Sequence, residues 1–339
     1  MAKKKIPSEL RFDLISKDWV IIATGRAKRP EAFKLKKRAK IKISKKECPF
    51  CNIETQKPPL LIFSKGKKIS SKKIPKDWTS IVIPNKYPAL LPQKTLKKKR
   101  EGKFYQKISG IGYCELVITR DHKKHFPHFE LWQIKEVIDC YQLRYLDLMK
   151  KPHVAYVSIF HNHGAEAGAS QPHPHSQIIT TPLIDVDLLK ALSNSKKYFE
   201  KIGKCIYCQM NKWEMKVKKR IIFENKDFLV LCPFASKSAF EVIISPKKHA
   251  SNFEKISEKE KWNLAEAFKV AMTKLYKALD DPPYNFYLHT APVKGKHSYY
   301  HWHFTILPKT ATPAGFELGT RMEICVVEPE KAAQFLKKQ

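Results

Sequence analysis

Hydrophobic residues recur along this chain at two spacings, and each spacing predicts one kind of element. Within residues 129–149, Leu131, Ile134, Ile138, Tyr141 and Tyr145 recur every three or four positions, which is typical of an amphipathic helix. Residues 258–279 carry the same pattern and predict a second long helix. Short runs of β-branched and aromatic residues predict strands at 19–23, 80–84, 112–119, 154–160, 177–180, 228–231, 240–245 and 285–289.

Two other segments lack such a clear pattern. Residues 54–78 are rich in Lys, Ser and Pro, and they predict an irregular excursion from the strands around them. Residues 183–204 predict a short helix and a polar connection between two halves of the chain.

Residues of the types that bind metals occur twice in the same order. Each set is a C-x-x-C pair, then one histidine, then two histidines separated by a single residue. The step from the single histidine to the pair is 51 residues in the first set (173 − 122) and 52 in the second (301 − 249). This repetition predicts one unit that was duplicated and fused. The sets are Cys48, Cys51, His122, His173 and His175, and Cys205, Cys208, His249, His301 and His303.

The order of strands and helices in the two repeats predicts an α+β fold. Each unit would be an antiparallel sheet with one long helix, and the two units would be related by a pseudo-twofold. We expect an N-terminal half over residues 1–190 that carries the active histidine. The C-terminal half, residues 191–339, would hold a structural metal.

Two thiolates and two imidazoles form a closed tetrahedral set that suits Zn²⁺. The first predicted site is Cys48, Cys51, His122 and His173, and the second is Cys205, Cys208, His249 and His301. Two zinc ions per chain would follow, although His303 could replace His301 as the last ligand. The competing interpretation is a pair of reducible thiols with unrelated histidines. The other cysteines, Cys114, Cys140, Cys232 and Cys325, lie in apolar surroundings and are expected to be buried thiols.

His175 is left over from the first metal set, and a free neutral imidazole is a competent nucleophile toward phosphorus. Such a nucleophile needs hydrogen-bond donors for the phosphate oxygens. Gln177, Ser170 and the backbone of the turn that begins at Gly168 could supply them, and Arg26 and Arg29 could bind a diphosphate. His161 and His163 are expected in turn or surface roles.

Net charge is the one unusual feature of the composition, at +33 from 65 Lys and Arg against 32 Asp and Glu. A zinc-stabilised nucleic-acid-binding protein is therefore an alternative class. The lysines are scattered, however, which favours a solvated surface that also attracts small phosphorylated anions. The chain has no long apolar run and no apolar segment after its basic start, so we expect a cytoplasmic protein without a membrane segment or signal peptide.

An ordered series of motifs resembles the galactose-1-phosphate uridylyltransferase family, a branch of the histidine-triad superfamily. The series is Arg26-x-x-Arg29-Pro30, Cys48-Pro-Phe-Cys51, Asn85-Lys-Tyr-Pro-Ala89, Phe160-His-Asn162-His-Gly164, Gly168-Ala-Ser170, His173-Pro-His-Ser-Gln177, Pro246-Lys-Lys-His249, His301-Trp-His303 and Gly315-Phe-Glu317.

The resemblance implies a ping-pong transfer in which His175 takes a uridylyl group from UDP-glucose and passes it to galactose 1-phosphate. It implies that Asn85 and Asn162 contact the nucleoside or its phosphates. It also implies that Glu317 binds sugar hydroxyls across the interface of a homodimer. Proteins similar to this family also use ADP-glucose as phosphorylases or adenylyltransferases, and others hydrolyse nucleotides. Gln177 favours transfer over hydrolysis, because the hydrolytic relatives resemble H-x-H-x-H instead.

Overall fold

The computed structural model describes residues 8–24, 43–70 and 73–339, so the predicted Arg26 and Arg29 lie outside the described residues. The helices are α1 (Leu131–Leu148), α2 (Val186–Ile202), α3 (Ile206–Val217), α4 (Glu258–Leu279), α5 (Gly315–Thr320) and α6 (Pro329–Lys337), with short 3₁₀ turns η3 (Ile53–Thr55), η4 (Phe126–His128), η5 (Ala165–Ala167) and η6 (Phe253–Lys255). The strands are β1 (Glu9–Phe12), β2 (Trp19–Ile22), β3 (Leu61–Ser64), β4 (Lys67–Ile69), β5 (Ser80–Pro84), β6 (Lys98–Glu101), β7 (Tyr105–Ile108), β8 (Cys114–Thr119), β9 (Tyr156–His163), β10 (His175–Thr181), β11 (Ile221–Glu224), β12 (Phe228–Leu231), β13 (Val242–Pro246), β14 (Tyr284–His289), β15 (His303–Pro308) and β16 (Ile324–Cys325).

One large antiparallel sheet runs through both halves of the chain. Its eleven strands lie in the order β11-β12-β13-β15-β14-β9-β10-β8-β5-β3-β4. The two halves join where β9 pairs with β14, through register partners such as Asn162 and Asn285. The predicted α+β class with mostly antiparallel strands is confirmed. The pseudo-twofold stays a prediction.

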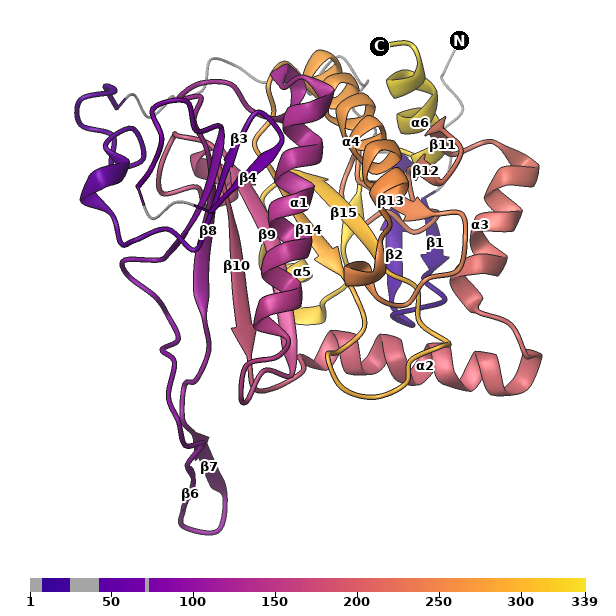
Figure 1. Cartoon of the computed structure of the whole chain (residues 1–339). Coiled ribbons are helices and arrows are strands. Elements are labelled where there is room, and N and C mark those ends of the chain that lie inside the picture. Colours follow the sequence, from indigo (N-terminus) through magenta and orange to yellow (C-terminus); the bar gives the residue numbers. More distant parts are fainter. Residues whose placement is uncertain (1–7, 25–42, 71–72) are drawn as a thin grey trace.

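The two long helices, α1 and α4, pack side by side across one face of this sheet (Figure 1). Capping boxes begin both helices, at Glu130 with Gln133 and at Ser257 with Glu260. Helix α4 ends at Leu279, and its C-cap Asp280 has a φ of 56°, in the left-handed region. The apolar faces of both helices and the sheet form one continuous core.

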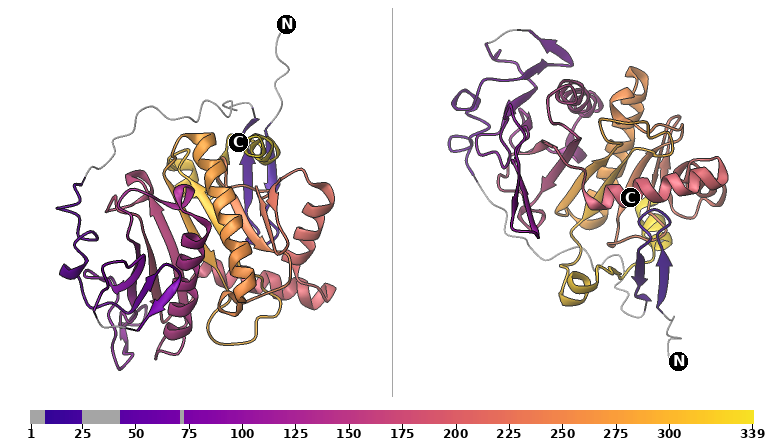
Figure 2. Two further views of the ribbon diagram at one scale, coloured as in Figure 1. Left: turned by 45° about the horizontal axis from the view of Figure 1, so that its top comes forward. Right: turned by 90° about the horizontal axis from the view of Figure 1, so that it is seen from below.

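The opposite face of the sheet carries the candidate chemistry, because successive side chains of a strand alternate between faces. On β10, Ser176 points to the helices, where its hydroxyl is hydrogen-bonded to the hydroxyl of Tyr141 from α1 (2.6 Å). His175 and Gln177 therefore project from the face that α1 and α4 leave open. Views from two further directions show both long helices on the same side of the sheet (Figure 2).

Several predicted elements are confirmed, and others are wrong. The predicted helices at 129–149 and 258–279 are α1 and α4, and the repeated strands are found within two or three residues of their expected bounds. The irregular excursion predicted at 54–78 instead contains β3 and β4, which extend the sheet. The helix predicted to be short within 183–204 is the 17-residue α2.

Two small sheets lie outside the main one. Strands β1, β2 and β16 form a three-stranded sheet, which brings the segment around residue 20 next to the segment around residue 325. Strands β6 and β7 form a separate hairpin that projects from the body of the protein (Figure 1). Within the described residues, no helix combines the length and apolar character that crossing a membrane requires.

Candidate active site and metal centres

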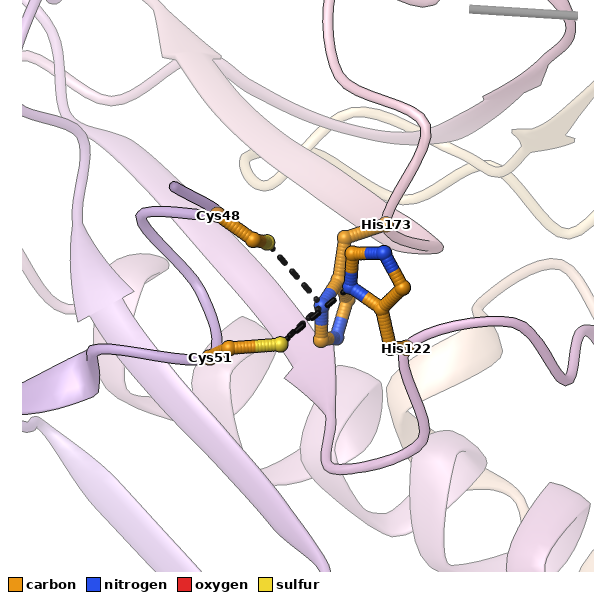
Figure 3. A group of neighbouring side chains, drawn as sticks. All are labelled: Cys48, Cys51, His122 and His173. Atoms are coloured by element: carbon orange, nitrogen blue, oxygen red, sulfur yellow. Dashed lines mark hydrogen bonds between the residues drawn. The ribbon is translucent and has the colours of Figure 1, made fainter. Parts of the chain in front are cut away.

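The first predicted metal set comes together at one end of β8 and β10 (Figure 3). The Nδ1 atom of His173 lies 3.4 Å from the sulfur of Cys48 and 3.6 Å from that of Cys51. The Nδ1 atom of His122 lies 3.2 Å from the Cys51 sulfur. A tetrahedral zinc with ordinary bond lengths would hold sulfur and nitrogen ligands about 3.5 Å apart. The donor set and its spacing therefore fit Zn²⁺ with four protein ligands.

The second predicted set also gathers, with Cys205 as the N-cap of α3. The sulfur of Cys208 lies 3.4 Å from Nδ1 of His249 and 3.5 Å from Nδ1 of His301. All four ligand atoms of this group lie within 4.8 Å of one another, and His303 does not belong to the group. The geometry thus favours His301 over His303 as the last ligand.

Backbone carbonyls orient the ligand histidines from outside each cluster. The Nε2–H groups of His122, His173 and His301 donate to the carbonyl oxygens of Ile43 (3.0 Å), Thr119 (2.7 Å) and Pro246 (2.9 Å). A carbonyl oxygen only accepts, so the proton must sit on Nε2 and the lone pair on Nδ1. Every one of these Nδ1 atoms faces the thiols, as a metal ligand should.

His175 lies beside the first cluster without joining it. Its Nδ1 atom donates to the carbonyl oxygen of His173 at 2.9 Å, so the lone pair of the neutral ring is on Nε2. The ring is buried and packs edge-on against Phe50, with 5.0 Å between the ring centroids. Burial lowers the pKa of His175 and outweighs the opposing effect of the carbonyl contact. The side chain is therefore a neutral imidazole at pH 7 with a defined nucleophilic atom.

A row of polar side chains crosses the open face from His175. Ser176 pairs with His161, so Asn162 lies across from His175 on the neighbouring strand β9. Asn285, the register partner of Asn162, continues the row onto β14. Gln177 lies in the next row, opposite Phe160. The sheet thus brings together three predicted site residues, His175, Gln177 and Asn162.

The predicted phosphate-binding turn connects β9 with the metal cluster. Gly164 and Gly168 have φ values of 83° and 82°, a conformation that favours glycine. A side chain at Gly164 would also meet Pro283, whose Cβ atom lies 2.8 Å from the position of the added carbon. The backbone N–H groups of Ala167 and Ala169 both donate to the Gly164 carbonyl oxygen, each at 3.1 Å. Ser170 is exposed at the end of this turn.

Two other predicted residues lie farther out in the structure. Asn85 follows β5, and its side-chain oxygen accepts a hydrogen bond from the backbone of Tyr87 (3.0 Å). Glu317 is in α5, where its carboxylate caps the backbone N–H of Ala314 (3.0 Å). Among the described hydrogen bonds, neither side chain contacts His175 or the turn.

His161 and His163 lie on the helix-covered face, away from the predicted nucleophile. His161 is buried and its Nδ1 atom lies 3.1 Å from the Ser176 hydroxyl. His163 lies 2.9 Å from Asp281, which is also 3.4 Å from His125. The rings of His125 and His163 are stacked at 4.0 Å and 15°. By contrast, the ring centroids of His122 and His173 lie 5.3 Å apart with 85° between the ring planes, and those of His249 and His301 lie 5.6 Å apart with 62° between the planes. The stacked pair is arranged as two hydrogen-bonding partners of one carboxylate.

Two residues of this site are not predicted by the sequence. Phe50 belongs to the predicted Cys-Pro-Phe-Cys motif, and its ring contacts both His173 (5.7 Å) and His175 (5.0 Å). Asn285 was placed only in a predicted strand. Because Asn285 alternates with the apolar Phe286, the sequence could have assigned Asn285 to the polar face of its strand. Nothing in the sequence, however, indicates that this strand pairs with the strand of Asn162.

Comparison with known proteins agrees with this arrangement. The chain matches the model of the galactose-1-phosphate uridyl transferase N-terminal domain over residues 1–184, and that of the C-terminal domain over residues 191–324. It is 33% identical to the ADP-glucose phosphorylase of Arabidopsis thaliana over 97% of this chain and 92% of the relative. It is 30% identical to the galactose-1-phosphate uridylyltransferase of Thermotoga maritima over 97% of this chain and 98% of the relative.

Solved structures give the same result. The crystal structure of an ADP-glucose phosphorylase from Arabidopsis thaliana with bound ADP-glucose superposes with a TM-score of 0.81. The match has 30% identity and covers 98% of each chain. The chain therefore belongs to the galactose-1-phosphate uridyl transferase family and is an enzyme of the nucleotidyltransferase class.

Proposed function

We propose that this enzyme is a hexose-1-phosphate uridylyltransferase that moves a uridylyl group from UDP-glucose to galactose 1-phosphate through a covalent uridylyl-His175. The observation that carries the proposal is the 2.9 Å bond from His175 Nδ1 to the His173 carbonyl oxygen. It leaves the Nε2 lone pair as the reactive atom, next to a metal-type cluster but outside it. The family match and the Thermotoga maritima relative support the uridylyl group.

In the first half-reaction, the Nε2 lone pair attacks the α-phosphorus of UDP-glucose. The bond from that phosphorus to the bridging oxygen breaks, and glucose 1-phosphate leaves with the electron pair. The ring now bears a positive charge with its proton on Nδ1, and the carbonyl of His173 accepts from that N–H and stabilises the charge. No general base is needed, because the attacking nitrogen carries no proton.

In the second half-reaction, a phosphate oxygen of galactose 1-phosphate attacks the same phosphorus. The phosphorus–nitrogen bond breaks, UDP-galactose forms and His175 returns to its neutral state. The imidazole is a good leaving group because it departs without needing a proton on Nε2. The backbone N–H groups of residues 167–169 donate within the 164–170 turn, so the side chains of Gln177 and Asn162 supply the donors for the phosphate oxygens, where charge develops in both steps. We assign Ser170, Arg26 and Arg29 to the same task.

We further propose that both Cys₂His₂ sets hold zinc. A closed four-ligand zinc has no open position for substrate, and when bound it would contribute folding free energy. The first set also fixes His173, whose carbonyl oxygen orients the reactive ring. The halves 1–190 and 191–339 then differ in task, because only the first adds a nucleophile and a phosphate turn to its metal set.

A homodimer in the cytoplasm completes the proposal. Helix α5, which carries Glu317, exposes the apolar side chains of Phe316 (47%) and Leu318 (73%). This exposure suits an interface through which Glu317 meets the sugar of the partner's site. None of the eight cysteines, all of which the structure describes, is paired in a disulfide, which suits a reducing compartment. The dispersed lysines of the surface suit small anionic substrates.

Adenylyl transfer from ADP-glucose is the second candidate. The observation that favours it is the 33% identity to an ADP-glucose phosphorylase across almost the whole of both chains. In that reaction His175 would take an adenylyl group, and inorganic phosphate would replace the hexose 1-phosphate as acceptor. The face around His175 serves either nucleotide, because its donors meet phosphate oxygens rather than the base.

Isotope exchange tests the proposal. The enzyme is incubated with UDP-glucose and radiolabelled glucose 1-phosphate, without galactose 1-phosphate. A ping-pong enzyme moves label into UDP-glucose, because the first half-reaction is reversible by itself. Exchange with ADP-glucose only would select the second candidate, and no exchange with either would contradict both.

A further inference from the structure

Asn285 lies on β14, in the C-terminal half, yet it holds two parts of the predicted nucleotide site. Its side-chain nitrogen donates to the side-chain oxygen of Asn162 (2.8 Å) and to the backbone carbonyl oxygen of Ala167 (2.8 Å). Asn162 lies across from His175 on the neighbouring strand, and Ala167 is in the 164–170 turn. One amide therefore ties the strand to the turn that follows it.

The Ala167 carbonyl decides which way both amides point. A carbonyl oxygen only accepts, so the atom of Asn285 that faces it must be the nitrogen. That nitrogen also faces Asn162, so the atom of Asn162 that receives it must be the oxygen. The nitrogen of Asn162 then points toward the turn, where it lies 3.9 Å from the position that a side chain at Gly168 would occupy.

We infer that Asn285 is a positioning residue for nucleotidyl transfer: it orients the Asn162 amide so that its N–H groups face the bound phosphates, and it fixes the 164–170 turn. The inference rests on the proposed function, in which those groups meet phosphate oxygens. The physical reason is the sign of the dipole. An Asn162 amide turned by 180° would present its oxygen to an anion, and attraction would become repulsion.

Residues of the C-terminal half also hold the end of β9 on its other face. His163, the residue after Asn162, lies 2.9 Å from Asp281, which precedes β14. Tyr284, at the start of β14, is the register partner of His163 and stacks on its ring with centroids 4.9 Å apart. These contacts fix the main chain at the end of β9. The hydrogen bond from Asn285 then sets the orientation of the Asn162 side-chain amide.

Two substitutions separate orientation from simple loss of contact. Asn285→Ala removes the donor and leaves the Asn162 amide free to turn. Asn285→Asp places a carboxylate oxygen where the nitrogen was, which repels the Ala167 carbonyl and draws the Asn162 nitrogen toward itself. The matched control is Asn225→Asp. The Asn225 nitrogen also donates two 2.8 Å bonds, to the Asn263 carbonyl and to the Glu266 carboxylate, in the β11–β12 turn.

The first measurement is hydrogen exchange of the ligand-free enzyme, which needs no activity. Both Asn285 variants should exchange the backbone amides of residues 167–169 about tenfold faster than wild type. Asn225→Asp should leave these amides unchanged. Unaltered exchange in both Asn285 variants would overturn the inference, whether or not the proposed reaction is correct.

The second measurement is the rate of His175 nucleotidylation from UDP-glucose and from ADP-glucose. We expect the nucleotidylation rate to fall roughly tenfold in Asn285→Ala and roughly a hundredfold in Asn285→Asp, because a misplaced donor weakens the stabilisation of the phosphate oxygens. Asn225→Asp should keep the wild-type rate at a temperature where all variants are folded. Equal rates for Asn285→Ala and Asn285→Asp would contradict the orienting role. A wild-type enzyme that forms no adduct would refute the proposed function instead, and the exchange result would still decide whether Asn285 holds the turn.

Discussion

The two halves of this enzyme build the same frame around a histidine, but different side chains face that histidine in each half. His175 and His303 each follow a ligand histidine by two residues, and each Nδ1 atom bonds the carbonyl oxygen of that ligand, at 2.9 Å and 3.1 Å. Both ligands, His173 and His301, are held from behind by a backbone carbonyl. The frame itself therefore does not decide where chemistry occurs.

The difference lies in what faces each histidine. Asn162 lies across from His175, whereas His289 is the register partner of His303 and stacks on its ring at 4.6 Å. Tyr207 also packs against His303, with ring centroids 5.5 Å apart. The first half thus sets the Asn162 amide across from its buried histidine, whereas the second packs the rings of His289 and Tyr207 against its half-buried histidine. The two frames therefore differ in the side chains that face the histidine rather than in the backbone that holds it.

Removal of each histidine should give the largest contrast. His175→Ala should lower nucleotidyl transfer by at least about 10⁴-fold and abolish the covalent intermediate, because the nucleophile is lost. His303→Ala should keep the intermediate and change the rate by less than about tenfold. Steady-state rates and intact mass measure both. Loss of the adduct in His303→Ala would show that the two halves have been assigned the wrong way round.

Removal of one thiol from each metal set should separate stability from activity. Cys51→Ser and Cys208→Ser should each lose one metal ion per chain and lose stability on the order of several kcal/mol. Cys51→Ser should also lower the transfer rate by about a hundredfold, since its site holds His173, whereas Cys208→Ser should lower it much less. Elemental analysis and thermal unfolding test this. Two ions retained in Cys208→Ser would exclude the second site.

Exchange of the residue two positions after each histidine should give a smaller effect. Gln177→Thr introduces the residue found at position 305 and should slow nucleotidylation by roughly 10- to 100-fold, because a donor to the phosphates is lost. Thr305→Gln should not create a second modified histidine, since the ring of His289 still stacks on His303. Peptide mapping after incubation with substrate would reveal any second adduct.

The smallest expected difference between the halves is in how the free energy of unfolding depends on pH. Burial lowers the pKa of His289 to about 4. The unfolded chain therefore binds this proton first, and the stability due to neutral His289 is complete above about pH 6.5 and lost as the pH falls toward 4. His289→Asn introduces the residue type that Asn162 provides across from His175 in the first half. Wild type loses unfolding free energy between pH 7.5 and 5, and this variant should lose less, by at most about 2 kcal/mol. Urea unfolding at both pH values measures it, and an unchanged loss would contradict the assignment.

The sequence predicted those features that depend on local order along the chain. The periodic patterns predicted α1 and α4, and the spacing of cysteines and histidines predicted two clusters that the structure does assemble. The β6–β7 hairpin and β4 were not predicted, because their lysine-rich strands show no apolar alternation. Strand β3 is a short apolar run inside a segment rich in Lys, Ser and Pro, and that composition masked it. Asn285 was missed for a different reason. Its role arises from the pairing of β9 with β14, and register between strands 120 residues apart leaves no local pattern.

Intact-mass analysis of the covalent adduct tests the central claim most directly. Wild type, His175→Ala and His303→Ala are each incubated with UDP-glucose, and separately with ADP-glucose, without an acceptor. We predict that wild type and His303→Ala gain the mass of one uridylyl group, located at His175 by peptide mapping, and that His175→Ala gains none. An adduct with ADP-glucose alone would identify the adenylyl reaction. An adduct at His303, or none with either donor, would contradict the account.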